Sequence, residues 1–329
     1  YDFLRGFTEN IYIICLLFFG TYFTIIFLVG IPFNLYFNFM VEKKYGFNNM
    51  TLKIWILDSI KELIISFVFG TILLLPLTFL LYTFPSFWFV PVWGFLIVFS
   101  LFVQIIYPTI IAPLFNKFEP LKNEELKLKI ENLLKECGFE SSGLFEMDAS
   151  KRSSHGNAYF TGFGKSKRIV LFDTLLKRHT DEEILAVLAH ELGHFKHKHI
   201  LKSLVVSSAF SLIGFFLANL FIDAKIIYDT FGLDQNAKII GLFLLSILFT
   251  PISFFTTPFG AFFSRKNEYQ ADAFSKEKMK DPLPLINALK KLNVDNLSSL
   301  YPHPLYAWFY YSHPPLLYRI GALNKKTKE

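Results

Sequence analysis

Charged residues are scarce in this chain. They make up 18% of its 329 residues, whereas a soluble globular protein carries about 25%. Hydrophobic residues reach 53%, 41 residues are phenylalanine, and the mean hydropathy is positive. This balance argues against an ordinary soluble domain and predicts an integral membrane protein.

Cysteine is rare as well: Cys15 lies in an apolar run and Cys137 near the end of a charged amphipathic segment. Two isolated cysteines argue against a disulfide framework and against a cysteine-ligated zinc site. No basic run with interleaved aromatic residues sits on a soluble segment, so we expect no nucleic-acid partner. We assign the net charge of +6 to membrane topology and lipid contact. The chain begins at Tyr1 rather than Met, and we expect an upstream segment to be missing.

Long apolar runs, by contrast, are plentiful. A helix needs about 20 predominantly apolar residues to cross the hydrocarbon core of a bilayer. Five stretches meet this requirement, roughly 11–40, 63–82, 87–115, 200–221 and 239–263. A soluble α protein with apolar core helices would rarely carry five such runs. We therefore predict a mainly α-helical, polytopic membrane protein, with Pro251 and Pro258 either kinking the last span or serving its packing.

The loop charges predict the orientation of these spans. The turn 83–86 holds no Lys or Arg, whereas the segment 116–199 and the tail after Phe263 are basic. The loop expected between the first two spans carries Lys43, Lys44, Lys53 and Lys61. Because positive loops stay in the cytoplasm, both polar segments are predicted to face that side.

The polar segment reads as a small folded domain. A 3.6-residue period over 123–135 predicts an amphipathic helix that Gly138 ends. Two strands are expected at 158–163 and 168–172, joined as a hairpin by the turn 164–167. A further helix follows, with Thr180 or Asp181 as its cap.

That last helix carries the motif His190-Glu191-x-x-His194. Residues four apart lie on one helical face, so both histidines can bind one zinc ion per chain while Glu191 acts as general base. The small residues Ala189 and Gly193 are expected to leave room near the metal. Taken alone, the motif is also compatible with an alternative, in which these are two ordinary histidines on a helix surface beside a glutamate.

A catalytic zinc site needs a third protein ligand. One known solution places a histidine six residues after the second one, but Ile200 occupies that position. The other solution is a glutamate on a separate helix, and Glu268 with Asp272 four residues later fits it. Glu268 is the expected ligand, and Asp272 is expected to accept a hydrogen bond from a ligand histidine.

Two further histidines follow the motif closely, and we do not interpret them as metal ligands. His197 and His199 alternate with Lys196 and Lys198. This alternation favours a basic collar at the membrane surface over metal binding.

Together these motifs and the interleaved spans resemble the Ste24 family of CAAX prenyl proteases, the integral-membrane zinc metalloproteases of peptidase family M48. Three more stretches match the pattern of that family: 154–160, 168–173, and 312–315 with Arg319. The resemblance implies that His313 and Arg319 act near the zinc as donors to the oxyanion. It also implies that Asn157, Ala158 and Tyr159 hold the substrate backbone, so that the expected catalytic residues are Glu191, Asp272, His313 and Arg319.

The function implied is a membrane-embedded zinc metalloendopeptidase with a zincin-type domain. Its expected partners are membrane lipid and peptide or protein substrates, including C-terminally prenylated Cys-a-a-X proteins. Two alternatives stay open: a shorter HtpX-like quality-control protease without prenyl specificity, and a non-catalytic membrane protein with a structural zinc site. The expected location is the inner or plasma membrane, or the endoplasmic reticulum.

Four segments follow from this interpretation. Transmembrane helices occupy 1–115, the segment with the zinc motif 116–199, two further spans 200–263, and the C-terminal catalytic segment 264–329.

Overall fold

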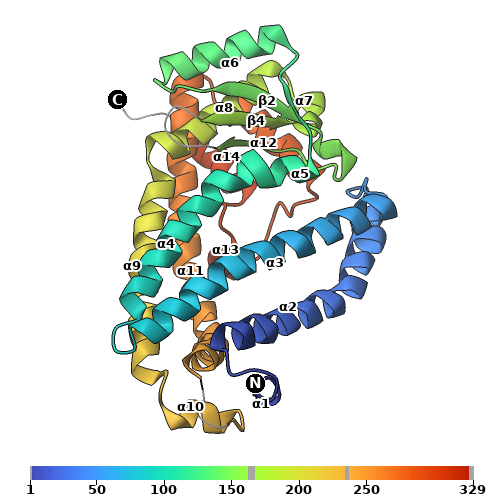
Figure 1. Cartoon of the computed structure of the whole chain (residues 1–329). Helices are drawn as coiled ribbons and strands as arrows, with labels where there is room; N and C mark the ends of the chain where they lie inside the picture. Colours follow the sequence, from blue (N-terminus) through green and yellow to red (C-terminus); the bar gives the residue numbers. More distant parts are fainter. Residues whose placement is uncertain (1, 162–166, 234–236, 326–329) are drawn as a thin grey trace. The chain divides into compact units, whose positions relative to one another are not determined.

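The computed structural model describes residues 2–161, 167–233 and 237–325 (Figure 1). Its contacts form two compact units. The first comprises the chain up to Val103 together with Val205–Pro251, and the second comprises Gln104–Leu204 and the chain from Ile252 onward. The chain passes between them within α4 (Phe89–Ile106), α9 (His199–Phe221) and α11 (Lys238–Met279). The four-segment division made from the sequence stays a prediction.

In the described residues, five helices are long and apolar enough to cross a membrane: Ile11–Glu42, Leu52–Thr83, Phe89–Phe115, His199–Phe221 and Lys238–Met279. They match the five predicted apolar runs, the third of which was expected to begin two residues earlier, and they support a multi-pass membrane protein. One loop prediction was wrong, because helix α3 (Leu52–Thr83) includes Lys53 and Lys61. A helix of 32 residues is about 48 Å long, more than the roughly 30 Å of hydrocarbon, so its charged first turns need not enter the lipid.

The first unit is made of helices. It holds α1 (Asp2–Arg5), α2 (Ile11–Tyr36) with the π-helical turns Phe37–Glu42, α3, most of α4, and α10 (Lys225–Thr230). A core forms around the fully buried Trp88, Leu81 and Ile222. Phe23, Ile64 and Phe210 are more than half exposed. Exposed apolar side chains of this size suit helices that lipid tails solvate.

A four-stranded sheet lies at the centre of the second unit, in the order β1-β2-β4-β3. Its strands are β1 (Phe118–Pro120), β2 (Gly143–Met147), β3 (Ala158–Thr161) and β4 (Arg168–Phe172). The predicted pairing of β3 with β4 is confirmed as antiparallel, with Ala158 opposite Leu171. Residues 162–166, which hold most of the predicted turn, lie outside the described residues. β1 and β2 were not predicted, and β2 pairs with β4 in parallel.

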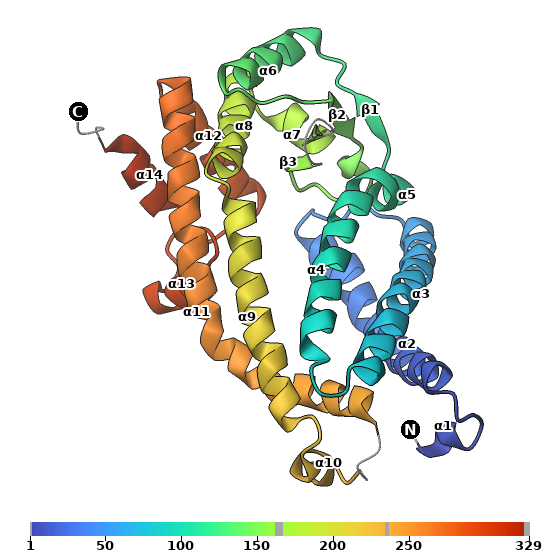
Figure 2. The same ribbon diagram turned by 60° about the vertical axis from the view of Figure 1, so that its left-hand side comes forward.

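The two faces of the sheet differ. Alternation along β4 turns Ile169 and Leu171 toward α6 (Glu124–Glu136) and α8 (Asp181–Lys196), where they join the largest core of the unit. Val170 faces the other way and packs with Met147. Figure 2 shows α6 lying next to α8. The predicted boundaries of α6 hold, because Asn123 caps its start and Gly138 follows its end at φ +64°.

Helices from the C-terminal part surround α8. α12 (Leu283–Asp295) and α14 (Leu316–Asn324) pack on it through Ala186, Leu285 and Leu316. The remaining short elements are α5 (Ala112–Phe115), α7 (Asp173–Arg178), α13 (Pro304–Tyr310), the 3₁₀ turn Ala149–Lys151 and the π-helical turn Tyr107–Ile111. Contrary to expectation, α11 does not end near Phe263. It continues through Glu268 to Met279, so one helix contains both the last span and the second half of the site.

Candidate metal centre

Helix α8 starts at a capping box. Thr180 Oγ1 accepts a hydrogen bond from the Glu183 N–H at 3.4 Å, and Glu183 Oε2 accepts one from the Thr180 N–H at 3.0 Å. This reciprocal cap pairs N–H groups that the first turn leaves unsatisfied. With the start fixed, the 3.6-residue period places His190 and His194 on one face, one turn apart.

Three side chains converge beside that face. The ligand atoms of His190, His194 and Glu268 all lie within 4.8 Å of one another. The two Nε2 atoms are 3.2 Å apart. Glu268 Oε2 lies 3.4 Å from Nε2 of His190, and Oε1 lies 3.3 Å from Nε2 of His194. Two imidazoles and one carboxylate are the ligand set of a catalytic zinc site that keeps a fourth position open.

The electrostatics fit a divalent cation. Glu268 Oε2 is buried and has no hydrogen-bond partner in the described part of the chain, a costly state for a carboxylate oxygen unless it coordinates a metal. Burial lowers the pKa of the His190 ring, but the adjacent carboxylates of Asp272 and Glu268 outweigh it and raise that pKa to about 9. The two carboxylates therefore create a negative potential at the imidazoles, which favours a bound cation.

Asp272 holds the outer nitrogen of the first histidine. Its Oδ1 lies 2.9 Å from Nδ1 of His190, and its two oxygens accept from Nε and Nη2 of Arg319 at 2.8 and 2.6 Å. Burial lowers the pKa of Arg319 and the Asp272 carboxylate raises it by more, so the guanidinium stays charged. Since an ionised carboxylate can only accept, His190 must donate Nδ1–H. In its neutral form the ring therefore keeps the lone pair on Nε2, where it can bind a metal.

Glu191 lines a cavity of about 660 Å³ together with His190 and Glu268. Burial raises the pKa of the Glu191 carboxyl, and the nearby His190 and His194 oppose that rise. A carboxylate tuned upward in this way can accept a proton from water. His313 lines the same cavity, with Nε2 3.5 Å from Glu268 Oε1, and its side chain is 66% exposed.

The residues expected to bind substrate separate into two groups. Asn157 and Ala158 line the cavity beside Glu191, whereas Tyr159 packs with Val170 on the other face of the sheet. The same alternation along β3 that directs Ala158 to one face directs Tyr159 to the other. The side chain of Tyr159 is therefore not part of the cavity wall, although its backbone stays on the edge strand.

Two features of the site escaped the sequence interpretation. His199 is 3% exposed, its Nδ1 lies 3.0 Å from Nδ1 of His194, and its Nε2 lies 2.8 Å from Oε1 of Gln270. It therefore does not belong to an exposed basic collar. The alternating lysines hid this, and the buried position of His199 depends on the turn that precedes it.

Gly193 also has a role other than the expected one. A Cβ at this position would lie 2.8 Å from Cα of Ala271 and 3.1 Å from Cβ of Phe274. The glycine thus lets α11 approach α8 closely, and Ser275 Oγ donates to the Ala186 carbonyl across the same contact at 2.7 Å. This close packing, rather than space at the metal, explains the small residue.

The chain matches known protein families over nearly its whole length. Residues 120–327 match the model of peptidase family M48, and residues 1–117 match the model described as CAAX prenyl protease N-terminal, five membrane helices. The probable CAAX prenyl protease 1 of Schizosaccharomyces pombe is 41% identical over 91% of this chain and 63% of its own length. The human CAAX prenyl protease 1 homolog is 38% identical, over 90% of this chain and 70% of its own length.

A solved structure agrees with this match. The crystal structure of S. mikatae Ste24p superposes with a TM-score of 0.90 at 39% identity, and covers 94% of this chain and 75% of that one. The resemblance drawn from the motifs is confirmed. The chain therefore belongs to peptidase family M48 and is of the membrane-embedded CAAX prenyl protease type.

Proposed function

We propose that this protein is a zinc-dependent endopeptidase that cleaves the C-terminal end of prenylated Cys-a-a-X substrates. The convergence of His190, His194 and Glu268, with Glu191 lining the same cavity, carries this proposal. The names of its relatives, CAAX prenyl protease 1, support the substrate class. The match covers about two thirds of the length of those relatives, so the complete activity is itself proposed here.

His190, His194 and Glu268 would hold the zinc ion. When bound, zinc supplies Lewis acidity, which acidifies water and polarises a carbonyl. Glu191 accepts the proton of the attacking water and returns it to the leaving amine. Asp272 keeps His190 in the tautomer that can bind the metal, and Arg319 holds Asp272 in place.

The donor to the developing oxyanion would be His313. It is exposed in the cavity, and the one hydrogen bond described for its ring is to Ser312 Oγ at 3.0 Å. Arg319, which the resemblance also suggested for this task, has Nε and Nη2 directed at Asp272, and its Nη1 lies 3.6 Å from Glu268 Oε2. We therefore assign Arg319 to positioning and His313 to charge stabilisation.

Substrate would lie along β3. This strand is the last in the sheet and pairs with β4 on one side. A peptide in extended form can add to such an edge by main-chain hydrogen bonds, which tolerate many side chains. Ala158, the first residue of β3, and Asn157 just before it line the cavity of Glu191, so a peptide there would pass the catalytic carboxylate.

The membrane topology supports the same substrate class. By the positive-inside rule, the basic loops favour a cytoplasmic catalytic segment, and prenylated proteins are found on that side. Glu268 lies on α11, which is itself one of the candidate spans, so a lipid-anchored substrate would find apolar helix surface on the same element as the site. Plasma or inner membrane and endoplasmic reticulum are both compatible with this orientation, and the absence of a nucleic-acid partner stays a prediction.

A cleavage assay tests the proposal. The detergent-purified chain is incubated with a farnesylated Cys-a-a-X peptide and with its unprenylated twin, each with and without a zinc chelator. We expect cleavage of the farnesylated peptide, its loss with chelator, and its recovery when zinc is added back.

Two other outcomes would redirect the assignment. Equal cleavage of both peptides would favour a quality-control protease without prenyl specificity. Absence of cleavage in a protein that binds zinc stoichiometrically would favour a structural metal site.

A further inference from the structure

In each histidine of the metal centre, Nε2 faces Glu268 and Nδ1 is the outer nitrogen. The two Nδ1 atoms face different kinds of partner. Nδ1 of His190 faces the carboxylate of Asp272 at 2.9 Å. Nδ1 of His194 instead faces Nδ1 of His199 at 3.0 Å, and Nε2 of His199 faces Gln270 Oε1 at 2.8 Å. Nδ1 of His194 is thus supported by the imidazole of His199, which in turn contacts the amide of Gln270. None of these partners is a carboxylate.

The direction of these hydrogen bonds follows from their last member. Because an amide oxygen only accepts, His199 donates Nε2–H to Gln270, and its Nδ1 carries a lone pair. That lone pair can accept Nδ1–H from His194. His194 then keeps a lone pair on Nε2, the atom directed at the Glu268 carboxylate. The opposite direction would place a proton on that Nε2 and prevent it from binding a metal.

The backbone is arranged to bring His199 to this position. α8 ends at Lys196, His197 caps it, and Lys198 adopts a left-handed conformation with φ +55° before α9 begins at His199. A non-glycine residue in this region is strained and uncommon. The sharp turn brings the ring of His199, the first residue of α9, into contact with His194. Local strain that orders a buried polar contact is typical of functional sites.

Gln270 comes from the same helix as the other supports. It lies on α11 between Glu268, which faces both Nε2 atoms, and Asp272, which faces Nδ1 of His190. One segment of five residues therefore supplies the carboxylate ligand, the partner of Nδ1 of His190 and, through His199, the support of Nδ1 of His194. A shift of this segment would change all three contacts together.

We propose that His199 and Gln270 form a neutral relay that fixes the tautomer and orientation of His194 for metal binding. Both are positioning residues, since neither touches the reacting atoms. The proposal rests on the proposed function only in taking His194 as a zinc ligand. Outer partners of ligand histidines typically change metal affinity or activity by about 10–100-fold, and we expect an effect in that range.

The test measures metal binding by the whole chain in detergent. Zn²⁺ affinity is determined by competition with a chromophoric chelator, and Co²⁺ spectra report the ligand geometry. His199→Leu and Gln270→Leu remove the first and the last acceptor of the relay. Each is expected to weaken Zn²⁺ binding about 10–100-fold and to change the Co²⁺ spectrum.

Two further variants separate positioning from packing. His199→Asn places its amide oxygen near the former Nδ1, so it should restore most of the affinity that His199→Leu loses. His197→Ala is the matched control, because this ring stacks on His199 with centroids 5.5 Å apart but makes no described hydrogen bond to His194. The His197→Ala variant should bind Zn²⁺ with the affinity of the unaltered protein. Gln270 is only half-buried, so Gln270→Leu should fold even if His199→Leu does not.

The outcomes distinguish this proposal from the proposed function. Unaltered Zn²⁺ affinity in Gln270→Leu, or in a folded His199→Leu, would overturn the relay while leaving the peptidase intact. An equal loss of affinity in His199→Leu and His199→Asn would also overturn it, because shape rather than an acceptor would then matter. If the unaltered protein binds Zn²⁺ with the expected variant pattern but cleaves no peptide, the peptidase assignment fails and the relay stands.

Discussion

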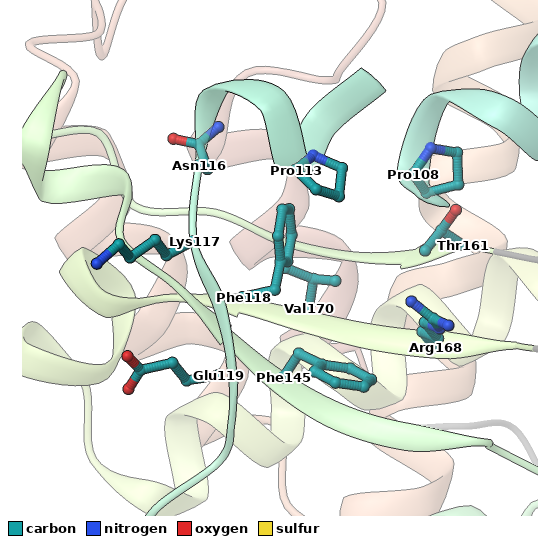
Figure 3. Close-up of a pocket in the computed structure, with 10 residues that line it drawn as sticks. All are labelled: Pro108, Pro113, Asn116, Lys117, Phe118, Glu119, Phe145, Thr161, Arg168 and Val170. Carbon is teal, nitrogen blue, oxygen red and sulfur yellow. The ribbon is translucent and has the colours of Figure 1, made fainter. Parts of the chain in front are cut away.

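Two of the cavities in the second unit differ in kind. The cavity of the metal centre measures about 660 Å³, and its wall includes the buried side chains of His190, Glu268 and Arg319. A cavity of about 370 Å³ lies on the sheet face that carries Val170 (Figure 3). Lys117, Glu119 and Arg168 line it, and all three are exposed.

The charged groups of the smaller cavity do not converge. Glu119 pairs with Lys122 at 2.7 Å, and the Arg168 guanidinium lies over the Phe145 ring at 5.4 Å. Figure 3 shows Lys117 and Glu119 pointing away from Phe145 and Val170. In water such groups interact weakly, whereas buried groups a few ångströms apart shift each other's protonation and attract a metal. Convergence of buried titratable groups, and not cavity volume, identifies the reactive site.

The largest effect is expected for Glu191→Gln. Loss of the general base should lower the rate of peptide cleavage by about 10²–10⁴-fold, while zinc binding persists because the ligands are intact. The measurement is kcat for a cleaved peptide together with zinc stoichiometry. Glu182→Gln, an exposed glutamate in the first turn of the same helix, is the control and should stay within about twofold. Undiminished cleavage by Glu191→Gln would rule out the mechanism.

Glu268→Gln should be next in size. The amide keeps the shape of the side chain but removes the charge that faces both imidazoles, so zinc affinity should fall by more than the roughly 10–100-fold typical of outer partners. The zinc content of the variant after dialysis against a weak chelator, compared with that of the unaltered protein, measures this loss of affinity. Retention of zinc at the level of the unaltered protein would show that the third ligand lies elsewhere.

Asp272→Asn should have an intermediate effect with two components. Zinc affinity should fall about 10–100-fold because His190 loses its carboxylate acceptor. Stability should fall by about 3–5 kcal/mol because the buried Arg319 loses the carboxylate to which its Nε and Nη2 donate. Thermal unfolding and chelator competition separate the two.

A double variant sharpens this prediction. Adding Arg319→Gln to Asp272→Asn should restore part of the stability and none of the zinc affinity. It removes the buried charge that lost its main partner, but it does not give His190 back a carboxylate acceptor. If affinity recovered along with stability, the carboxylate would have no specific role at His190.

The smallest effect is expected at the second cavity. Arg168→Gln alters an exposed side chain outside the metal centre, so stability should change by no more than about 0.5 kcal/mol and cleavage by less than about twofold. The same cleavage assay and thermal unfolding measure it. A loss comparable to that of Asp272→Asn would show that this cavity takes part in catalysis, and the contrast between the two cavities would be lost.

Local patterns predicted the elements of this protein well. The apolar runs gave the five helices, because twenty apolar residues have few other solutions. β1 and β2 were missed because three and five residues of mixed polarity carry no clear alternation, and their pairing comes from contacts with β4 and with each other. The end of α11 was misplaced because polarity changes at Arg265 without any helix-breaking signal.

The sequence by itself determined the membrane class and the placement of His190, Glu191 and His194 on one helix, because backbone period and apolar burial act between near neighbours. Only the tertiary structure decided which distant groups complete the site. Glu268 and Asp272 reach the histidines because Gly193 admits α11 against α8, and His199 reaches His194 because Lys198 turns the chain sharply. Such contacts depend on three-dimensional packing and on a strained backbone angle, and neither leaves a regular signature in the order of residues.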